Sequence, residues 1–265
     1  MSPRREASAP AGGPSEGRGN RLLDALPARE RKRLFRQFEV VETDMKQRLM
    51  DPGAPIPFVY FPLTAVISLL TTMEDGVGVE IATVGNEGMV GVQVFLGANR
   101  LNPRDLVQDQ VPGTALRISA RDFMEESRDG KPLRPIVERY VQAYLRQVSQ
   151  QVACNGLHSV QERCARWILL THDRVGADEF PLTQEFLSQM LGVRRASVTV
   201  AAGALQTAGF IRFRRGRITI LDRQGLERSS CECYEIIRQE FDRLLTPRDG
   251  AAPVEDRRPV PKPTS

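Results

Sequence analysis

The stretch that decides the fold is residues 182–221, which read LTQEFLSQMLGVRRASVTVAAGALQTAGFIRFRRGRITIL. Thr183 is a good helix N-cap, and the apolar residues after it recur at helical spacing. Gly192 then permits a tight left-handed turn, after which a second helix begins at Arg194 and runs to about Ala208. Two helices joined by a short glycine turn are the helix-turn-helix pattern.

Two short β-rich runs follow the second helix and predict a hairpin, or wing. Its strands are residues 210–213 and 217–220, joined by the turn Arg214-Arg215-Gly216. Residues 183–221 hold six arginines and one acidic residue, a net charge of +5, whereas the whole chain carries +4. A local basic surface of this kind is typical of a nucleic-acid-binding domain.

These features predict a DNA-binding site. A recognition helix enters the major groove with its N-terminus first, where arginine can bond guanine. Hydroxyl groups, helix N-termini and the arginines of a wing suit phosphates. The predicted DNA-binding residues are Thr183, Arg194, Arg195, Ala196, Ser197, Thr199, Val200, Arg214, Arg215 and Arg217.

The rest of the chain indicates a second domain. At 265 residues, two modest domains are expected, and 41% hydrophobic residues are enough for a core. Residues 56–120 contain many short β-rich runs, with a hairpin turn at Glu74-Asp75-Gly76, which predicts a sandwich, roll or barrel. No apolar run is long enough to span a membrane and no secretory signal is visible, so we expect a cytoplasmic protein.

A long helix is predicted from Leu133, because apolar residues recur at spacings of three and four through Val152. Its apolar face is wide enough for two partners. One stripe is expected to cover the β-domain and the other to form a homodimer seam, the alternative being a helix buried within one chain. Asn155-Gly156 is expected to be a hinge after this helix. The predicted seam residues are Val137, Val141, Tyr144 and Val148.

The predicted fold class is therefore α+β, with an N-terminal double-stranded β-roll (jelly-roll-like), a long dimerisation helix and a C-terminal winged helix-turn-helix. The proline-rich ends are expected to be disordered. The expected segments are 1–20 (tail), 21–131 (sensory β-roll, with two short helices before the strands), 132–158 (dimer helix and hinge), 159–245 (DNA-binding domain, closed by a helix Gln224–Leu245 after the N-cap Asp222) and 246–265 (tail).

The four cysteines, at positions 154, 164, 231 and 233, are expected to be thiols in packing or surface positions. Cys231 and Cys233 have one residue between them, whereas zinc sites usually have two to four. A metal or redox role is the alternative. The two histidines, His158 and His172, are expected to be structural or on the surface rather than haem ligands. With no nucleophile elbow or phosphate-binding loop, we predict no catalytic residue, no metal, no cofactor and no enzyme activity.

The order of β-roll, long helix and winged helix resembles the Crp/Fnr family of bacterial transcription regulators, over roughly residues 21–245. The most specific stretches are residues 182–185 and 192–198. The resemblance places Arg195 at a base-reading position, whereas Ala196 stands where the family often has Glu, and Val200 occupies another base-reading position. The preferred half-site of better-known members is therefore not transferable. The resemblance implies double-stranded DNA, a second copy of the chain and RNA polymerase as partners.

The sensory half departs from the family. Members that bind cyclic nucleotides carry a Gly-Glu pair and, further on, Arg-Ser/Thr; here Gly91 precedes Val92, and Arg104-Asp105 is the nearest counterpart. The four-cysteine iron–sulfur signature of oxygen-sensing members is missing. We therefore expect no response to cyclic AMP and an effector that is unknown. The effector-pocket residues implied by the resemblance are Glu87, Gly88, Gly91, Val92 and Arg104.

One other class of function fits the sequence, a ligand-binding regulatory module that acts on a protein partner without DNA. The arginine pair Arg194-Arg195 at the start of the second helix argues against it. Retention on a heparin or DNA column separates the two hypotheses, because a protein-only module would flow through.

Overall fold

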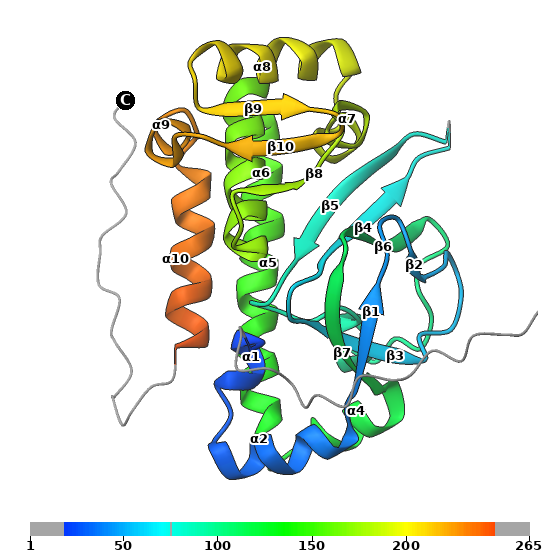
Figure 1. Ribbon diagram of the computed structural model, residues 1–265. Coiled ribbons are helices and arrows are strands. Elements are labelled where there is room, and N and C mark those ends of the chain that lie inside the picture. The colour runs from blue at the N-terminus through cyan, green and yellow to red at the C-terminus, as the bar shows by residue number, and fades with distance from the viewer. Residues whose placement is uncertain (1–18, 75, 247–265) are drawn as a thin grey trace, which may run out of the picture.

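The computed structural model describes residues 19–74 and 76–246, and Figure 1 shows their arrangement. Seven antiparallel strands form the N-terminal β-domain in two sheets, one of order β1-β7-β3 and one of order β2-β6-β4-β5. This confirms the predicted two-sheeted roll. The strands are β1 (Glu39–Thr43), β2 (Arg48–Met50), β3 (Phe58–Pro62), β4 (Val66–Thr72), β5 (Gly78–Val84), β6 (Asp105–Val111) and β7 (Gly113–Ser119).

Short helices close the β-domain. The two that precede it, α1 (Arg21–Asp24) and α2 (Ala28–Leu34), are separated at Pro27 as the sequence predicts, and a 3-10 turn (Phe35–Gln37) follows. The remaining two, α3 (Val92–Phe95) and α4 (Ala120–Glu126), flank β6 and β7.

The expected tails lie mostly outside the described residues. Asn20, assigned to the N-terminal tail, is instead buried. Its side chain donates to the carbonyls of Pro62 and Gly88 and accepts from the backbone N–H of Leu23, which caps α1. Asn20 therefore belongs to the folded β-domain rather than to a tail.

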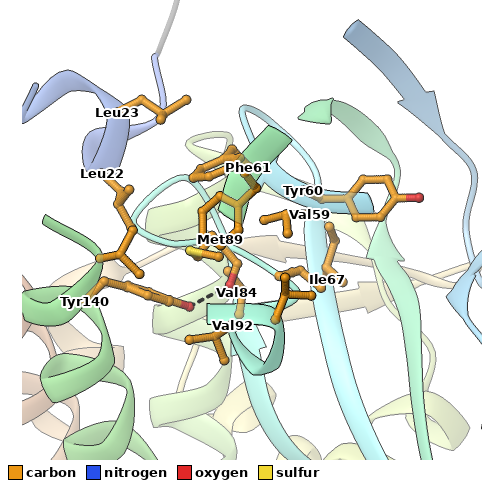
Figure 2. Close-up of a cluster of buried hydrophobic side chains, with 14 of the residues drawn as sticks. Leu22, Leu23, Val59, Tyr60, Phe61, Ile67, Val84, Met89, Val92 and Tyr140 are labelled. Carbon is orange, nitrogen blue, oxygen red and sulfur yellow. Dashed lines mark hydrogen bonds between the residues drawn. The ribbon is translucent and has the colours of Figure 1, made fainter. Parts of the chain in front are cut away.

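The core of the β-domain lies between the sheets and the long helix (Figure 2). Tyr140 is almost fully buried, and its hydroxyl donates a 2.9 Å hydrogen bond to the carbonyl of Met89. Gly88 passes directly beneath this ring, where a Cβ would lie 2.5 Å from it. The long helix is therefore fixed to the β-domain by a close backbone approach as well as by apolar burial.

The long helix is α5 (Leu133–Leu157), and it is continuous through Asn155-Gly156. The hinge expected there is therefore wrong. The chain breaks instead at His158, whose backbone is extended, and α6 (Val160–Val175) begins after Ser159. The side chains of Ser159 and Glu162 form a capping box, which specifies the start of the new helix.

The C-terminal domain has its own core around α6. A three-stranded sheet of order β8-β10-β9 packs with the helices, and Trp167 and Leu205 are among the buried residues. The elements are β8 (Glu179–Pro181), α7 (Gln184–Leu191), α8 (Arg195–Thr207), β9 (Ile211–Arg214) and β10 (Arg217–Ile220). The predicted helix-turn-helix and wing are both present.

The helix expected over Gln224–Leu245 is two helices, α9 (Arg223–Arg228) and α10 (Cys233–Leu245), although Asp222 is the N-cap as predicted. The break lets α10 turn back along α5 (Figure 1). Phe241 and Leu244 on α10 join the core of the β-domain, so the last helix bridges the two halves of the molecule. Among the described residues, no helix combines the length and the apolar character that crossing a membrane requires.

Candidate nucleic-acid interface

The helix-turn-helix is built as its sequence predicts. The Thr183 hydroxyl accepts a 3.1 Å hydrogen bond from the N–H of Phe186 and caps α7. Gly192 ends that helix with φ of +63°, a conformation that side chains other than glycine rarely adopt. Val198 and Leu205 of α8 are fully buried against α6 and α7, so the opposite face of α8 is turned outward.

The outward face of α8 carries the predicted base-reading residues. Arg195, Ala196, Thr199 and Val200 are all exposed, and their spacing places them on one side of the helix. Val200 is 75% exposed, so its apolar side chain is available to a partner. Ser197 is only half-buried and lies at the edge of this face.

The first turn of α8 has no side-chain cap, because its N-cap residue is Arg194. Its first backbone N–H groups therefore remain available to an anion, and the helix dipole favours negative charge at this end. Thr199 donates to the amide oxygen of Gln184 and to the carbonyl of Arg195, at 3.0 and 3.1 Å. Gln184 thus orients a residue of the outward face of α8 from the preceding helix.

The wing is a tight hairpin whose tip is cationic. Arg215 and Gly216 both have positive φ, +51° and +76°, as a two-residue turn of the hairpin type requires. Arg214 and Arg215 are exposed at this tip. Arg217, also predicted to contact DNA, pairs with Arg214 across the hairpin next to the tip, but its guanidinium forms an ion pair with Glu179 of β8.

The arginines of this surface are largely free of competing carboxylates. Arg195 has one acidic neighbour, Glu185, at 4.0 Å, and both side chains are well exposed, so the pair is worth little. Within residues 19–74 and 76–246, no ion pair neutralises Arg194, Arg214 or Arg215. Their charge is therefore directed to solvent, at the end of the molecule that α8 and the wing form (Figure 1).

A buried polar junction joins this domain to the β-domain. Glu80 of β5 accepts hydrogen bonds from Ser68, Thr83 and Trp167 at 2.7, 3.1 and 3.0 Å. Burial raises the pKa of this carboxyl above its usual value. A second link is the ion pair between Arg174 of α6 and Glu87, at 2.8 Å, with both side chains buried.

The residues predicted for an effector pocket do not gather in one place. The Glu87 carboxylate is taken up by Arg174, and Gly88 lies beneath Tyr140. Gly91, with φ of +97°, precedes the buried Val92 at the start of α3. Arg104 is exposed and forms a 2.9 Å ion pair with Glu74 in the β4–β5 turn. These five residues therefore form an interdomain contact and parts of the β-domain rather than a shared anion site.

The predicted dimer seam is only partly available. Val137 is fully buried within its own chain, and Val141, Tyr144 and Val148 are half-buried against the core. The exposed apolar side chains of the helix are instead Leu145, Val152 and Leu157, at 58%, 70% and 80%. Val141, Tyr144 and Val148 are therefore still partly accessible beside the exposed apolar residues, whereas Val137 is not accessible to a second chain.

The cysteines are all buried, and three of them meet. Cys154 of α5, Cys231 and Cys233 lie together with His158, which the sequence spacing did not lead us to expect. A hydrogen bond with Cys231 lowers the pKa of Cys154 to about 5. Cys164 lies apart in the second core, where burial raises the pKa of its thiol to about 12, and it is the packing thiol that the sequence indicates.

This geometry is that of a winged helix-turn-helix domain joined to an antiparallel β-domain by a long helix. Comparison with protein families matches residues 162–229 to the Crp-like helix-turn-helix domain. The solved structure of FixK2 from Bradyrhizobium japonicum is 16% identical, with a TM-score of 0.61 over 73% of this chain and 98% of that one. A CRP-family transcriptional regulator from Thermus thermophilus is 18% identical, with a TM-score of 0.60 over 72% and 96%.

A third solved structure, CLP of Xanthomonas campestris, described as a c-di-GMP-responsive global regulator, is 13% identical with a TM-score of 0.58 over 73% and 99%. No curated protein matched the sequence. The chain thus carries a Crp-like helix-turn-helix domain and has the overall fold of the Crp/Fnr regulators. The Thermus thermophilus and Xanthomonas campestris proteins are both described as regulators.

Two contributors to the site were missed by sequence reasoning. The sequence places Gln184 after the Thr183 cap without indicating a role, yet its side-chain oxygen accepts a hydrogen bond from Thr199. Arg212 of β9 is exposed on the same strand as Arg214. The spacing of Arg212 and Arg214 could have predicted this, because residues two apart in a strand lie on the same face.

Proposed function

We propose that this protein is a cytoplasmic, sequence-specific DNA-binding transcription regulator that binds a near-palindromic site as a homodimer. The observation that carries the proposal is the exposed face of α8 (Arg195–Thr207). Its uncapped N-terminus and the Arg194-Arg195 pair point to solvent at the same end of the molecule as the wing.

Each part of this surface has a chemical role in a DNA complex. Arg195 would read a guanine edge in the major groove through a bidentate hydrogen bond, and the Val200 side chain suits a thymine methyl group. Arg214 and Arg215 would contact phosphates beside the groove, where charge contributes affinity without sequence preference.

The dimer is proposed to form through α5 (Leu133–Leu157). Val141, Leu145, Val148 and Val152 are spaced by four, three and four residues, which is the seam pattern of paired helices. Leu145 and Val152 in this row are the well-exposed members, so a single chain leaves them in water. A second copy is the occupant that a two-fold DNA site requires, because operator palindromes mirror the symmetry of the protein.

RNA polymerase is the further partner that the resemblance implies. Any effector would act through the junction between the β-domain and α6, where Glu80 meets Trp167 and Glu87 meets Arg174. The predicted cyclic-nucleotide positions offer no free carboxylate and no free arginine, so the effector would be of another chemistry.

The proposal is tested by selecting bound DNA from a random pool with the full-length protein. We expect an inverted repeat whose half-sites lie about 10–10.5 base pairs apart, together with affinity that falls steeply as salt increases. Absence of any enriched sequence, with no retention on heparin, would favour the alternative of a regulatory module that acts on a protein partner.

A further inference from the structure

Four potential metal ligands meet at the junction between α5 and α6. Cys154 lies in the last turn of α5, and His158 is the residue that ends it. Cys231 and Cys233 approach from the break between α9 and α10. One ligand atom from each of the four residues lies within 4.8 Å of all the others.

We propose that Cys154, His158, Cys231 and Cys233 form a tetrahedral zinc site. Two of the sulfurs, Sγ of Cys154 and Sγ of Cys231, are 3.5 Å apart, and Sγ of Cys233 lies 3.5 Å from Nδ1 of His158. A tetrahedral Zn²⁺ with Zn–S bonds of about 2.3 Å places its ligand atoms about 3.8 Å from one another. These two close pairs therefore need to move apart by no more than a few tenths of an ångström to admit one ion, and any pair near the 4.8 Å limit needs to move about 1 Å closer.

The donor set also favours zinc. Three cysteines and one histidine are among the standard ligand combinations of structural zinc sites, which are closed to solvent. The three cysteines here are buried, and no more than one ion fits among atoms packed this closely. Thiolate-rich sites select zinc over the harder magnesium and calcium ions, which prefer oxygen.

The groups around the cluster orient the ligands as a metal site requires. Nε2 of His158 lies 3.1 Å from a carboxylate oxygen of Glu232, so this nitrogen holds the proton and Nδ1 faces Cys233 with its lone pair. A histidine that binds metal usually donates its other N–H to such a carboxylate. Gln150 adds an N–H donor 3.1 Å from Sγ of Cys233.

The positive charge of Arg166 would balance the net charge of the zinc-loaded site. Zn²⁺ with three thiolates and a neutral histidine carries a net charge of −1. Arg166 of α6 is 2% exposed, and its Nε and Nη2 have no hydrogen-bond partner in the described chain. Its positive charge acts on both Cys154 and Cys231. A buried, unpartnered guanidinium is costly, and an adjacent anionic zinc centre would offset that cost.

Loading of the site would join three parts of the molecule. It fastens the end of α5 to the α9–α10 break, and α6 passes beside it. One turn of α6 carries Arg163 as well as Arg166, and Arg163 donates to the carbonyl of Leu191 at the end of α7. The metal would therefore stabilise the junction that positions the helix-turn-helix relative to the long helix.

The test is metal content and metal binding of the full-length protein purified under reducing conditions. We expect one zinc per chain by elemental analysis. After chelation, Co²⁺ should produce the visible and thiolate charge-transfer bands of a tetrahedral sulfur-rich site, and Zn²⁺ should displace it. Loading converts three thiols to thiolates, so up to three protons should be released per ion, which titration in weakly buffered solution measures.

Variants assign the ligands. Cys231→Ser and His158→Ala should abolish the tetrahedral Co²⁺ spectrum and lower zinc affinity strongly. Cys164→Ser is the matched control, because Cys164 is equally buried but lies in a different core, and it should bind one zinc. Glu232→Gln should keep the spectrum but weaken zinc binding by about 10–100-fold.

Three results would overturn the proposal. One is reduced, folded protein that takes up neither Co²⁺ nor Zn²⁺. Another is metal content unchanged in Cys231→Ser and His158→Ala, which would mark the ion as adventitious. The third is a native protein in which Cys154 and Cys231 form a disulfide and in which the site takes up no metal even after that disulfide is reduced. All three readouts are independent of DNA binding, so their outcome does not depend on the proposed function.

Discussion

The indole Nε1 of Trp167, on α6 of the C-terminal domain, donates a 3.0 Å hydrogen bond to the carboxylate of Glu80, on β5 of the N-terminal domain. Both residues are buried, so this contact forms part of the continuous interior that joins the domains. The helix α6, against which α8 packs, is thus held to the β-domain by a polar contact whose two partners are almost fully buried.

Removal of the indole donor should destabilise the protein. We expect Trp167→Phe to lower the free energy of unfolding by about 1–3 kcal/mol beyond the packing loss, because the Glu80 carboxylate loses a buried hydrogen bond. Urea unfolding measures the change. Glu80→Gln is the control, since its amide oxygen still accepts from the indole while the buried charge is removed. Equal or greater loss in Glu80→Gln would show that the hydrogen bond contributes little.

Arg195 should set base preference. We expect Arg195→Ala to weaken binding to the selected site by about 1–3 kcal/mol per half-site and to relax discrimination at one base pair. Arg215→Ala, at the tip of the wing, should instead weaken all sequences alike and flatten the dependence on salt. Fluorescence anisotropy on a panel of single-base variants measures both effects.

A third arginine serves as the control for charge alone. Arg128→Ala removes an exposed cation from the loop after α4, far from α8 in the fold, and should leave both affinity and preference unchanged. Unchanged base preference in Arg195→Ala would mean that α8 meets DNA in a different register.

Leu145 should mark the dimer seam. Leu145→Glu places two like charges beside each other in a symmetric apolar contact, where a desolvated, unpaired charge is costly. We expect a monomer by light scattering, together with a large loss of affinity for the palindromic site. Leu157→Glu changes a still more exposed residue that does not belong to the row Val141, Leu145, Val148 and Val152, and it should remain dimeric. Dimers in both variants would place the seam on another surface.

Asp109 should make stability depend on pH. It is fully buried, and burial raises the pKa of its carboxyl to about 7, an effect that neighbouring hydrogen-bond donors only partly oppose. A carboxyl with a raised folded-state pKa contributes stability that is complete below its unfolded pKa, about 3.9, and is lost as the pH rises through about 7. We therefore expect stability to decrease over this interval.

The Asp109→Asn variant isolates that effect, because an amide does not ionise. Relative to the native protein it should gain about 1–3 kcal/mol on moving from about pH 5 to about pH 8, measured by urea unfolding at each pH. A stability difference between the two proteins that is the same at both pH values would contradict the assignment.

Cyclic AMP and cyclic GMP should not bind. Val92 supplies an isopropyl group where the resembling regulators have a carboxylate, and Arg104 is engaged by Glu74. An unpaired ribose hydroxyl costs about 1–3 kcal/mol. Calorimetry up to about 1 mM nucleotide, which corresponds to about −4 kcal/mol of binding free energy, should show no saturable heat. Micromolar binding of a cyclic nucleotide, coupled to tighter DNA binding, would show that residues other than Val92 and Arg104 form the nucleotide pocket.

Local signals were sufficient to predict the helix-turn-helix domain. The Thr183 cap, the glycine at position 192 and the arginine turn of the wing each act within a few residues, and all appear as the sequence predicts. The hinge was predicted wrongly because helix propensity at Asn155-Gly156 is weak but not prohibitive. The capping box at Ser159 sets the break three residues later.

The sequence by itself determined the order of elements, the helix-turn-helix and the wing, because turn chemistry and hydrophobic period are local properties. Only the tertiary structure showed that Glu87 and Arg104 are engaged elsewhere and that α10 returns along α5. It alone brought Cys154 to Cys231, which are 77 residues apart. Contacts between residues so distant depend on how whole helices pack, and no local spacing encodes that packing.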